Sequence, residues 1–375
     1  MRSVLGAFLI YRKDGALMTY PTTIALPDFE ERKSLRKHYF RLAWIMITLV
    51  LVFTGLNTLI MNVSAMIMGG GFSKECIDAG KAILRSDPIM RSIYSYGFPI
   101  AADIAALAVG LIITKADLKS KLKTVGLSGK GFWNATAITF STATAASFVN
   151  IIIIFAIMAA MGKLSQFSVE STTSASIAPK GNPLWLDVII YIYICLLGPV
   201  LEELIFRGVL LEGLRKYGNL FGIIMSAVMF GLMHQNITQC IPAIAIGLVW
   251  SYIAVKSGSL IPSMLLHIIN NTMSAVLLAV VQSVNLNDLT DITAILNASV
   301  PLIIISAVIT IFRLVCVIAT IVIIARYCAK PHGKLVETNE YTNSRTVKYF
   351  FTSVPWLVII LYLIYTTVTS ISTIA

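Results

Sequence analysis

The sequence predicts an all-α fold, a polytopic membrane bundle of about eight or nine transmembrane helices. Hydrophobic residues make up 57% of the 375 residues and charged residues only 13%, whereas a soluble domain carries roughly 25% charged residues. The charges are also bunched, since none occurs between Lys130 and Lys163 or between Lys216 and Lys256. Such tracts exceed the roughly 20 apolar residues that a bilayer-spanning helix needs. This composition excludes a soluble enzyme, a disordered chain and a nucleic-acid-binding protein.

Apolar tracts bounded by charged residues define nine candidate spans. In chain order they are Leu42–Met61, Tyr96–Thr114, Ala135–Met161, a fourth that begins at Trp185, Leu220–Gln235, Ile241–Val255, Leu260–Val281, Pro301–Ile324 and Phe351–Ile371. The fifth and sixth are short for a membrane crossing. The spans predict four regions: a basic cytoplasmic tail over 1–40, N-terminal transmembrane helices over 41–183, a core over 184–283 and C-terminal transmembrane helices over 284–375.

The net charge of +11 is explained mainly by topology. Basic residues cluster before the first span, between the second and third, and after the fourth, sixth and eighth. In a nine-span count these loops all lie on one side, and cytoplasmic loops are the ones enriched in Lys and Arg. We therefore expect a multi-pass protein of the cell membrane with a cytoplasmic N-terminus. The same residues also suit anionic lipid headgroups, which is a secondary interpretation.

Cysteine and histidine are informative in opposite ways. The five cysteines are scattered and form no C-x-x-C pair, so the sequence predicts neither a disulfide framework nor a zinc knuckle. Only four histidines occur, and two of them, His234 and His267, lie in apolar tracts. Because an ionisable side chain within a membrane span is energetically expensive, such residues are functional candidates.

The fourth span carries three charges close together, at Glu202, Glu203 and Arg207. Glu203 and Arg207 are four residues apart on one helix face, in the order that favours an ion pair. Glu202 is rotated by about 100° from Glu203 and does not share that partner equally. The spacing therefore predicts one neutralised carboxylate and one available for chemistry. Pro199 precedes both glutamates and is expected to free a backbone carbonyl and bend the helix.

Three helices bring polar side chains to similar predicted depths. Measured from the basic ends at a rise of 1.5 Å per residue, Glu202 lies about 20 Å in and His234 about 22 Å in. On the seventh span, His267 and Asn271 lie about 12 Å and 18 Å in and share one helix stripe. Phe230 is four residues before His234, which places its ring beside the imidazole. This convergence is what a buried polar site requires.

Each of these features also has a structural interpretation. A Glu–Arg pair at a helix end can set orientation, and a membrane histidine more often joins helices than catalyses a reaction. For the isolated charges Asp103 and Arg313 we favour the structural interpretation, in which they pair with each other or extend towards water. The structural interpretation weakens for the other residues because they occur together at matching depth.

At these residues the sequence resembles the CPBP family of CAAX proteases and bacteriocin-processing enzymes, also called the ABI family. Its three ordered motifs, E-E-x-x-x-R, F-x-x-x-H and H-x-x-x-N, are matched by Glu202-Glu203-Leu-Ile-Phe-Arg207, Phe230-Gly-Leu-Met-His234 and His267-Ile-Ile-Asn270-Asn271. Each motif is weak alone, but all three in order on successive apolar segments are specific. The resemblance covers about 185–281 and implies a catalytic core of the type II CAAX prenyl endopeptidase kind.

The resemblance also implies a role for each motif residue. Glu202, helped by His234, would activate a water molecule for attack on the scissile carbonyl. His267 and Asn271 would stabilise the oxyanion, since hydrogen-bond donors in a dry cavity are worth more than in water. Glu203 with Arg207 would hold the helix and the carboxylate in place.

The sequence leaves the need for a metal open. Glu202, His234 and His267 form a sensible set of three zinc ligands, and members of the family are often named metalloproteases. The H-E-x-x-H pattern, which pairs zinc ligands with a base, is absent. We favour a glutamate-activated water without a required cofactor and keep zinc as the alternative. If Glu202 is a ligand, Glu203 becomes the base.

The leading hypothesis is an intramembrane endopeptidase that cleaves a membrane-associated peptide or a lipidated protein tail. Its expected partners are that substrate and membrane lipids, and no nucleic acid. The first alternative is a non-catalytic membrane protein on the same scaffold, such as a bacteriocin-immunity or partner-recruiting protein. The second is a proton-coupled transporter with the Glu/His cluster as a relay, which is disfavoured because the two halves carry no repeated broken helices.

Overall fold

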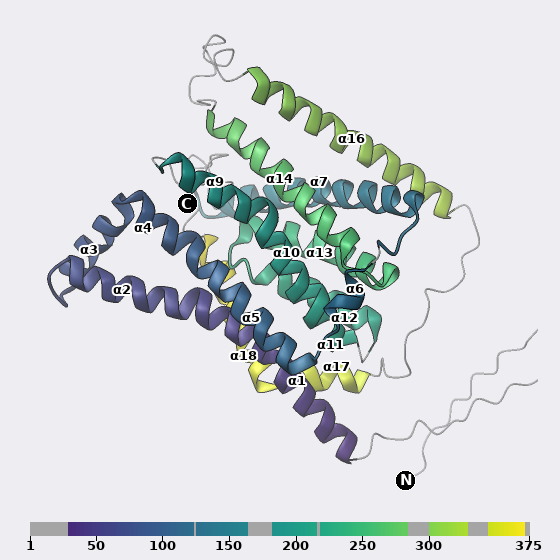
Figure 1. Ribbon diagram of the computed structural model, residues 1–375, viewed down its shortest axis with the longest axis horizontal. Helices are drawn as coiled ribbons and strands as arrows, with labels where there is room; N and C mark the ends of the chain where they lie inside the picture. Colours follow the sequence, from purple (N-terminus) through teal and green to yellow (C-terminus); the bar gives the residue numbers. More distant parts are fainter. Residues whose placement is uncertain are drawn as a thin grey trace, which may run out of the picture.

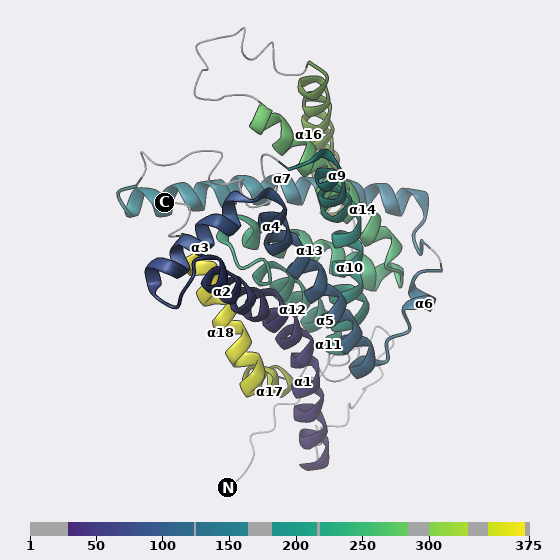
Figure 2. The same cartoon turned by 60° about the vertical axis from the view of Figure 1, so that its left-hand side comes forward.

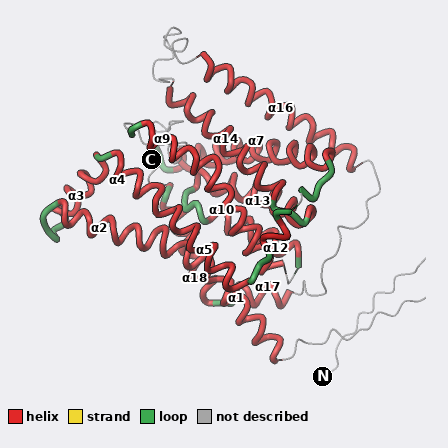
Figure 3. Tube along the Cα trace, in the orientation of Figure 1, coloured by secondary structure: helices red, strands yellow, loops and turns green. Residues whose placement is uncertain are grey.

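The computed structural model describes residues 29–123, 125–163, 182–215, 218–283, 300–328 and 344–371. Every regular element in these ranges is a helix (Figure 3). Seven helices are long and apolar enough to cross a membrane, and two shorter apolar helices, Asn219–Leu232 and Val354–Thr369, accompany them within the described part of the chain. The predicted polytopic all-α bundle is therefore confirmed, with one helix for each of the nine predicted spans.

The N-terminal half begins with two long helices joined by a short helical segment at one end of the molecule (Figure 1). Its elements are α1 (Phe29–Val50), η1 (Leu51–Leu56), α2 (Asn57–Met68), α3 (Lys74–Ser86), α4 (Pro88–Ser92), η2 (Ile93–Gly97), α5 (Phe98–Thr114), α6 (Leu118–Lys121) and α7 (Gly129–Ala160). The η segments are single π-helical turns within longer helices. Helix α1 packs along α5, and α2 packs against α3. Helix α7 extends across the bundle, where it contacts α13 and α16 (Figure 2).

The central helices lie between these layers (Figures 1 and 2). They are α9 (Leu184–Ile192), η5 (Tyr193–Leu197), α10 (Gly198–Glu203), η6 (Leu204–Leu210) and α11 (Leu211–Leu214), which run as one helix, followed by α12 (Asn219–Leu232), α13 (Ile237–Ser257) and α14 (Ile261–Ser283). The C-terminal elements are α16 (Val300–Cys328), α17 (Ser344–Phe351) and α18 (Val354–Thr369). One apolar core joins α1, the central helices and α17–α18.

The first helix begins earlier than the sequence predicted. Described residues 29–40 were assigned to a basic tail, but they form the first turns of α1. The reason is an apolar stripe that the charges conceal: Leu35 and Tyr39 are buried. The indole N–H of Trp356 on α18 also donates a hydrogen bond to the Tyr39 carbonyl at 2.8 Å. Helices α3 and α4 were likewise not predicted, because their mixed charges mark them as a loop when only apolar tracts are considered.

The fifth predicted span is a short helix that ends inside the bundle. Helix α12 stops at Leu232, and the chain reverses through Gln235, whose φ is +53°. The Asn236 side chain then caps α13 by accepting a hydrogen bond from the Gln239 backbone N–H at 2.8 Å. At 14 residues, α12 is about 21 Å long, which is less than the roughly 30 Å hydrocarbon thickness. His234 therefore lies in the turn after α12 rather than within a helix.

Gly231 makes the close approach of α12 to α13 possible. A β-carbon at this position would lie 2.3 Å from Cγ1 of Ile244 and 2.6 Å from the Cys240 carbonyl oxygen. We expect Gly231→Ala to lower the free energy of unfolding by about 1–3 kcal/mol, because neither backbone nor packed side chain can move freely. Thermal unfolding in detergent measures this loss. Gly129→Ala is the matched control, since a β-carbon there meets nothing within 4 Å, and an equal loss in both variants would contradict the prediction.

Candidate active site

The helix that carries the two glutamates changes its hydrogen-bond register just before them. In η5, the Gly198 N–H bonds to the Tyr193 carbonyl, five residues back. The next donor in this register would be residue 199, but Pro199 has no N–H, so the Ile194 carbonyl loses its helical partner. The side-chain amide of Asn271 on α14 fills this vacancy and donates to that carbonyl at 3.2 Å. The freed carbonyl expected from Pro199 is thus present, and it joins the third motif to the first.

This bond predicts a specific coupling between two substitutions. Asn271→Leu leaves the Ile194 carbonyl without a donor, and a buried polar group left unpaired costs about 1–3 kcal/mol. In a Pro199→Ala background the restored N–H can serve that carbonyl, so Asn271→Leu should then cost less. A double-mutant cycle in thermal stability measures the coupling. Equal costs of Asn271→Leu in both backgrounds would show that the two sites are independent.

Glu203 and Arg207 form an ion pair that is completely buried. The Arg207 Nη1 and Glu203 Oε1 atoms are 2.9 Å apart, and both side chains are 0% exposed. The guanidinium carbon lies 4.3 Å from the centre of the Phe230 ring, and Nη2 donates to the Gly247 carbonyl on α13 at 3.4 Å. A buried pair of this kind is stable only with such additional contacts. It ties the first motif to α12 and α13.

Glu202 is the more accessible of the two carboxylates. Its side chain is 15% exposed, and its Oε2 atom lies 3.4 Å from His267 Nε2. The other nitrogen of the same imidazole, Nδ1, lies 3.1 Å from Glu203 Oε1. The His267 ring also packs on the Trp250 ring, with 4.2 Å between centroids and an angle of 31°. One buried histidine therefore bridges both glutamates and is held in place by an indole.

His234 contacts the same Phe230 ring that His267 contacts. The two imidazoles of His234 and His267 each meet Phe230 edge to face, at centroid distances of 5.2 Å and 5.7 Å. His234 Nδ1 donates to the Phe230 carbonyl at 2.9 Å, because a carbonyl can only accept. In the neutral ring this leaves Nε2 as the acceptor nitrogen. Among the described contacts, His234 makes no hydrogen bond with Glu202.

Asp103 belongs to this site rather than to a surface pair. The expectation that Asp103 pairs with Arg313 or extends towards water is wrong for Asp103, which lies on α5, is 5% exposed and accepts a hydrogen bond from the Tyr193 hydroxyl at 3.2 Å. Its carboxyl group lies close enough to Glu202 to interact with it electrostatically. Helix α5 packs against α10 and η6, which brings a carboxyl group from outside the core to the first motif.

The zinc site considered from the sequence stays a prediction. Within the described ranges no three His, Cys, Asp or Glu side chains are grouped so as to hold a metal ion. The His267 ring directs one nitrogen at each glutamate, and Nδ1 of His234 is occupied by a backbone carbonyl. Whether Glu202, His234 and His267 bind zinc stays a prediction, and we derive no chemical step through a metal.

Two further residues of the site carry no charge and were missed. Tyr193 and Trp250 lie in apolar helices, where an aromatic residue is usually part of the core. The sequence signal for Tyr193 is its position six residues before Pro199. Asp103, which is charged, could also have been assigned to the site, because it is the only charged residue between Arg91 and Lys115. Trp250 offers no such signal, because its contact with His267 comes from the crossing of α13 and α14.

Comparison with known protein families gives a match over the central helices. Residues 183–273 match the family model described as type II CAAX prenyl endopeptidase Rce1-like. These residues are an Rce1-like domain of the CPBP family. The matched segment contains all three motifs and the helices α9 to α13 with the first half of α14. No curated protein and no solved structure gave a significant match to the chain. Over this segment, which is less than half of the chain, the protein is similar to CAAX-type membrane endopeptidases at the level of the family.

Proposed function

We propose that the protein is an intramembrane endopeptidase that hydrolyses a peptide bond near the end of a lipidated protein tail. The observation that carries the proposal is the pair of adjacent carboxylates with different environments. Glu203 is fully buried against Arg207, whereas Glu202 is partly exposed and touches His267. Two neighbouring carboxylates with divergent surroundings are typical of catalytic sites.

In the proposed mechanism Glu202 is the general base. It takes a proton from a water molecule as the water oxygen bonds to the scissile carbonyl carbon, and that proton passes to the leaving amine as the C–N bond breaks. General-base groups of this kind contribute typically 10²–10⁴-fold to the rate. His267, held between both carboxylates and Trp250, orients Glu202. Arg207 keeps Glu203 charged and so fixes the other side of that imidazole.

His234 is proposed to help Glu202 activate the attacking water, because its Nε2 atom can accept a hydrogen bond from that water. The donor role expected for Asn271 is less direct, because its amide already serves the Ile194 carbonyl. Asn271 instead positions the helix that carries Glu202. His234 is partly exposed at the end of α12, and its Nε2 atom is not committed to the backbone. It is therefore the motif residue best suited to contact a substrate that lies against Glu202.

The family description and the membrane setting favour a prenylated peptide as substrate. A prenyl chain dissolves in the bilayer, and this brings the attached peptide to a site between membrane helices. An acyl-anchored or wholly hydrophobic peptide is the competing substrate class. In both classes the apolar group supplies binding, and the peptide bond next to it is presented to Glu202.

The test is product profiling with the purified full chain. A farnesylated peptide ending in a CAAX sequence and the same peptide without the prenyl group are incubated with the wild type, Glu202→Gln and Glu75→Gln. Glu75 lies on the exposed face of α3 and controls for loss of a carboxylate. We expect mass spectrometry to detect a released tripeptide only with the prenylated substrate, and only from the wild type and Glu75→Gln. Cleavage by Glu202→Gln at the wild-type rate would contradict the role of Glu202 as the base, and no released tripeptide from the wild type would favour a non-catalytic role for this scaffold.

A further inference from the structure

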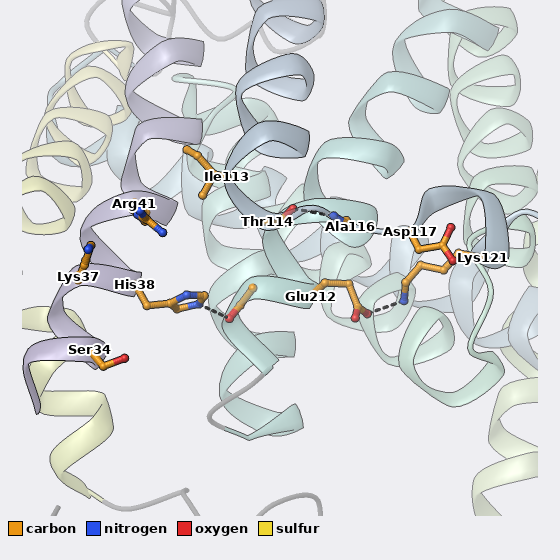
Figure 4. Close-up of a pocket in the computed structure, with 11 residues that line it drawn as sticks. Ser34, Lys37, His38, Arg41, Ile113, Thr114, Ala116, Asp117, Lys121 and Glu212 are labelled. Carbon is orange, nitrogen blue, oxygen red and sulfur yellow. Dashed lines mark hydrogen bonds and ion pairs between the residues drawn. The ribbon is translucent and has the colours of Figure 1, made fainter. Parts of the chain in front are cut away.

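A cavity at the basic end of the bundle is separate from the candidate active site. It has a volume of about 390 Å³, within the range of roughly 300–1,000 Å³ that is typical of small-ligand pockets. No motif residue lines it. Its walls come from α1, from the segment 113–121 at the end of α5 and in α6, and from α11 (Figure 4). Glu212 in this cavity follows Glu202 by about 15 Å along the same helix.

The cavity lies where three candidate membrane spans have their ends. One span begins at Lys33, one ends at Thr114 and one ends at Leu214, and residues at or next to each of these ends line the cavity. One turn deeper on α1, the Phe40 and Trp44 rings are 47% and 44% exposed and pack edge to face. Exposed aromatic side chains beside Lys and Arg mark the headgroup level of a membrane. The cavity is therefore at the depth of lipid headgroups.

Positive charge on one wall has no described counter-ion. Ser34, Lys37 and Arg41 recur at three- and four-residue spacing, so one face of α1 presents them. Lys37 and Arg41 are exposed, and no carboxylate in the described part of the chain forms an ion pair with either. On the same helix, His38 Nε2 donates to the Gly213 carbonyl at 3.0 Å and holds α1 against α11.

The two carboxylates on the opposite wall are already engaged. Glu212 Oε1 accepts hydrogen bonds from Lys121 Nζ at 2.6 Å and from Arg215 Nη1 at 3.0 Å. Asp117 caps α6 by accepting the Ser120 N–H at 3.1 Å, and this bond holds the pKa of Asp117 below its usual value. Figure 4 shows Lys121 and Glu212 across the cavity from the α1 side chains. An anion that enters the cavity therefore meets the positive charges of Lys37 and Arg41. The charge of Glu212 is compensated by Lys121 and Arg215, and Asp117 accepts a backbone N–H.

From these observations we propose that the cavity binds the phosphate group of an anionic membrane lipid. Lys37 and Arg41 bind the phosphate, the Ser34 hydroxyl donates to it, and the acyl chains lie along the apolar surface of α1 next to Phe40 and Trp44. Basic pockets between transmembrane helices recognise headgroups in this way. A soluble phosphate offers the same charge without the acyl chains, so the two sources differ in affinity.

The test compares lipids on the purified full chain. The probes are short-chain phosphatidic acid, short-chain phosphatidylcholine and inorganic phosphate, and the readouts are native mass spectrometry and the rise in Tm on binding. We expect phosphatidic acid to bind and to raise Tm, and phosphatidylcholine to do neither. An equal effect of inorganic phosphate would assign the cavity to a soluble anion. Equal binding of phosphatidylcholine would overturn the proposal.

Variants of the lining residues test whether phosphatidic acid binds in the cavity itself. Lys37→Gln/Arg41→Gln should weaken phosphatidic acid binding at least 10-fold, since each basic residue near a membrane surface contributes about 1 kcal/mol to anionic lipid binding. Lys74→Gln/Arg85→Gln removes the same two charges from exposed positions on α3 and should leave binding unchanged. Ser34→Trp fills the cavity without changing its charge and should also abolish binding. Equal losses in both double variants, or full binding by Ser34→Trp, would show a general surface effect.

Discussion

Glu202→Gln is expected to lower kcat/KM for a prenylated peptide by about 10²–10⁴-fold, the contribution typical of a general base. Glutamine has the same size and can keep the contact with His267, but it cannot take a proton from water. Because Glu202 is partly exposed and is not the partner of Arg207, the variant should unfold at nearly the wild-type temperature. Steady-state kinetics with a fluorogenic prenylated peptide, together with thermal unfolding of the same preparation, measure the two quantities.

The role of Glu202 is tested by comparing the activity of its variant with that of variants at other positions. Glu75→Gln should keep the wild-type kcat/KM, since that carboxylate lies on α3 and contacts no motif residue in the described structure. His267→Gln should lose activity as well, because it removes the group that orients Glu202. If Glu202→Gln retains activity whereas Glu203→Gln loses it without unfolding, the base has been assigned to the wrong glutamate.

Local patterns predicted the part of the site that depends on helix geometry. The i,i+4 relation of Glu203 and Arg207, the rotation of Glu202 away from that pair, and the carbonyl freed by Pro199 all follow from the sequence of one helix. The structure contains each of them. Long apolar tracts likewise predicted the helices that the structure describes for all nine spans.

Contacts made by the crossing of distant helices were not predictable in this way. Asp103 was expected to pair with Arg313 or to extend towards water. The packing of α5 against α10 instead places Asp103 beside Tyr193 and near Glu202. The end of α12 was predicted three residues late, at Gln235 instead of Leu232, since the uncharged turn offers no charge boundary and the positive φ of Gln235 shows where the chain reverses.

The largest expected effect on stability comes from breaking the Glu203–Arg207 pair. Arg207→Met leaves a carboxylate with no cation at a position that is 0% exposed, and Glu203→Gln leaves the guanidinium without an anion. Removing one partner of a buried ion pair costs about 3–5 kcal/mol, whereas replacing both with uncharged groups of similar volume is often nearly neutral. We therefore expect each single variant to be strongly destabilised and Glu203→Gln/Arg207→Met to be more stable than either.

The double-mutant cycle is measured as the free energy of unfolding in detergent, with the partly exposed Lys121–Glu212 pair as its control. In that pair the side chains are 18% and 26% exposed, so Lys121→Met should cost less than about 1 kcal/mol. Comparing the losses of stability in the two pairs shows the effect of burial, because both pairs join a Glu to a basic residue over a similar distance. If the losses at Glu203 and Arg207 simply add, the two side chains do not stabilise each other. That result would contradict the proposal that Glu203 is the buried partner of Arg207 while Glu202 acts as the general base.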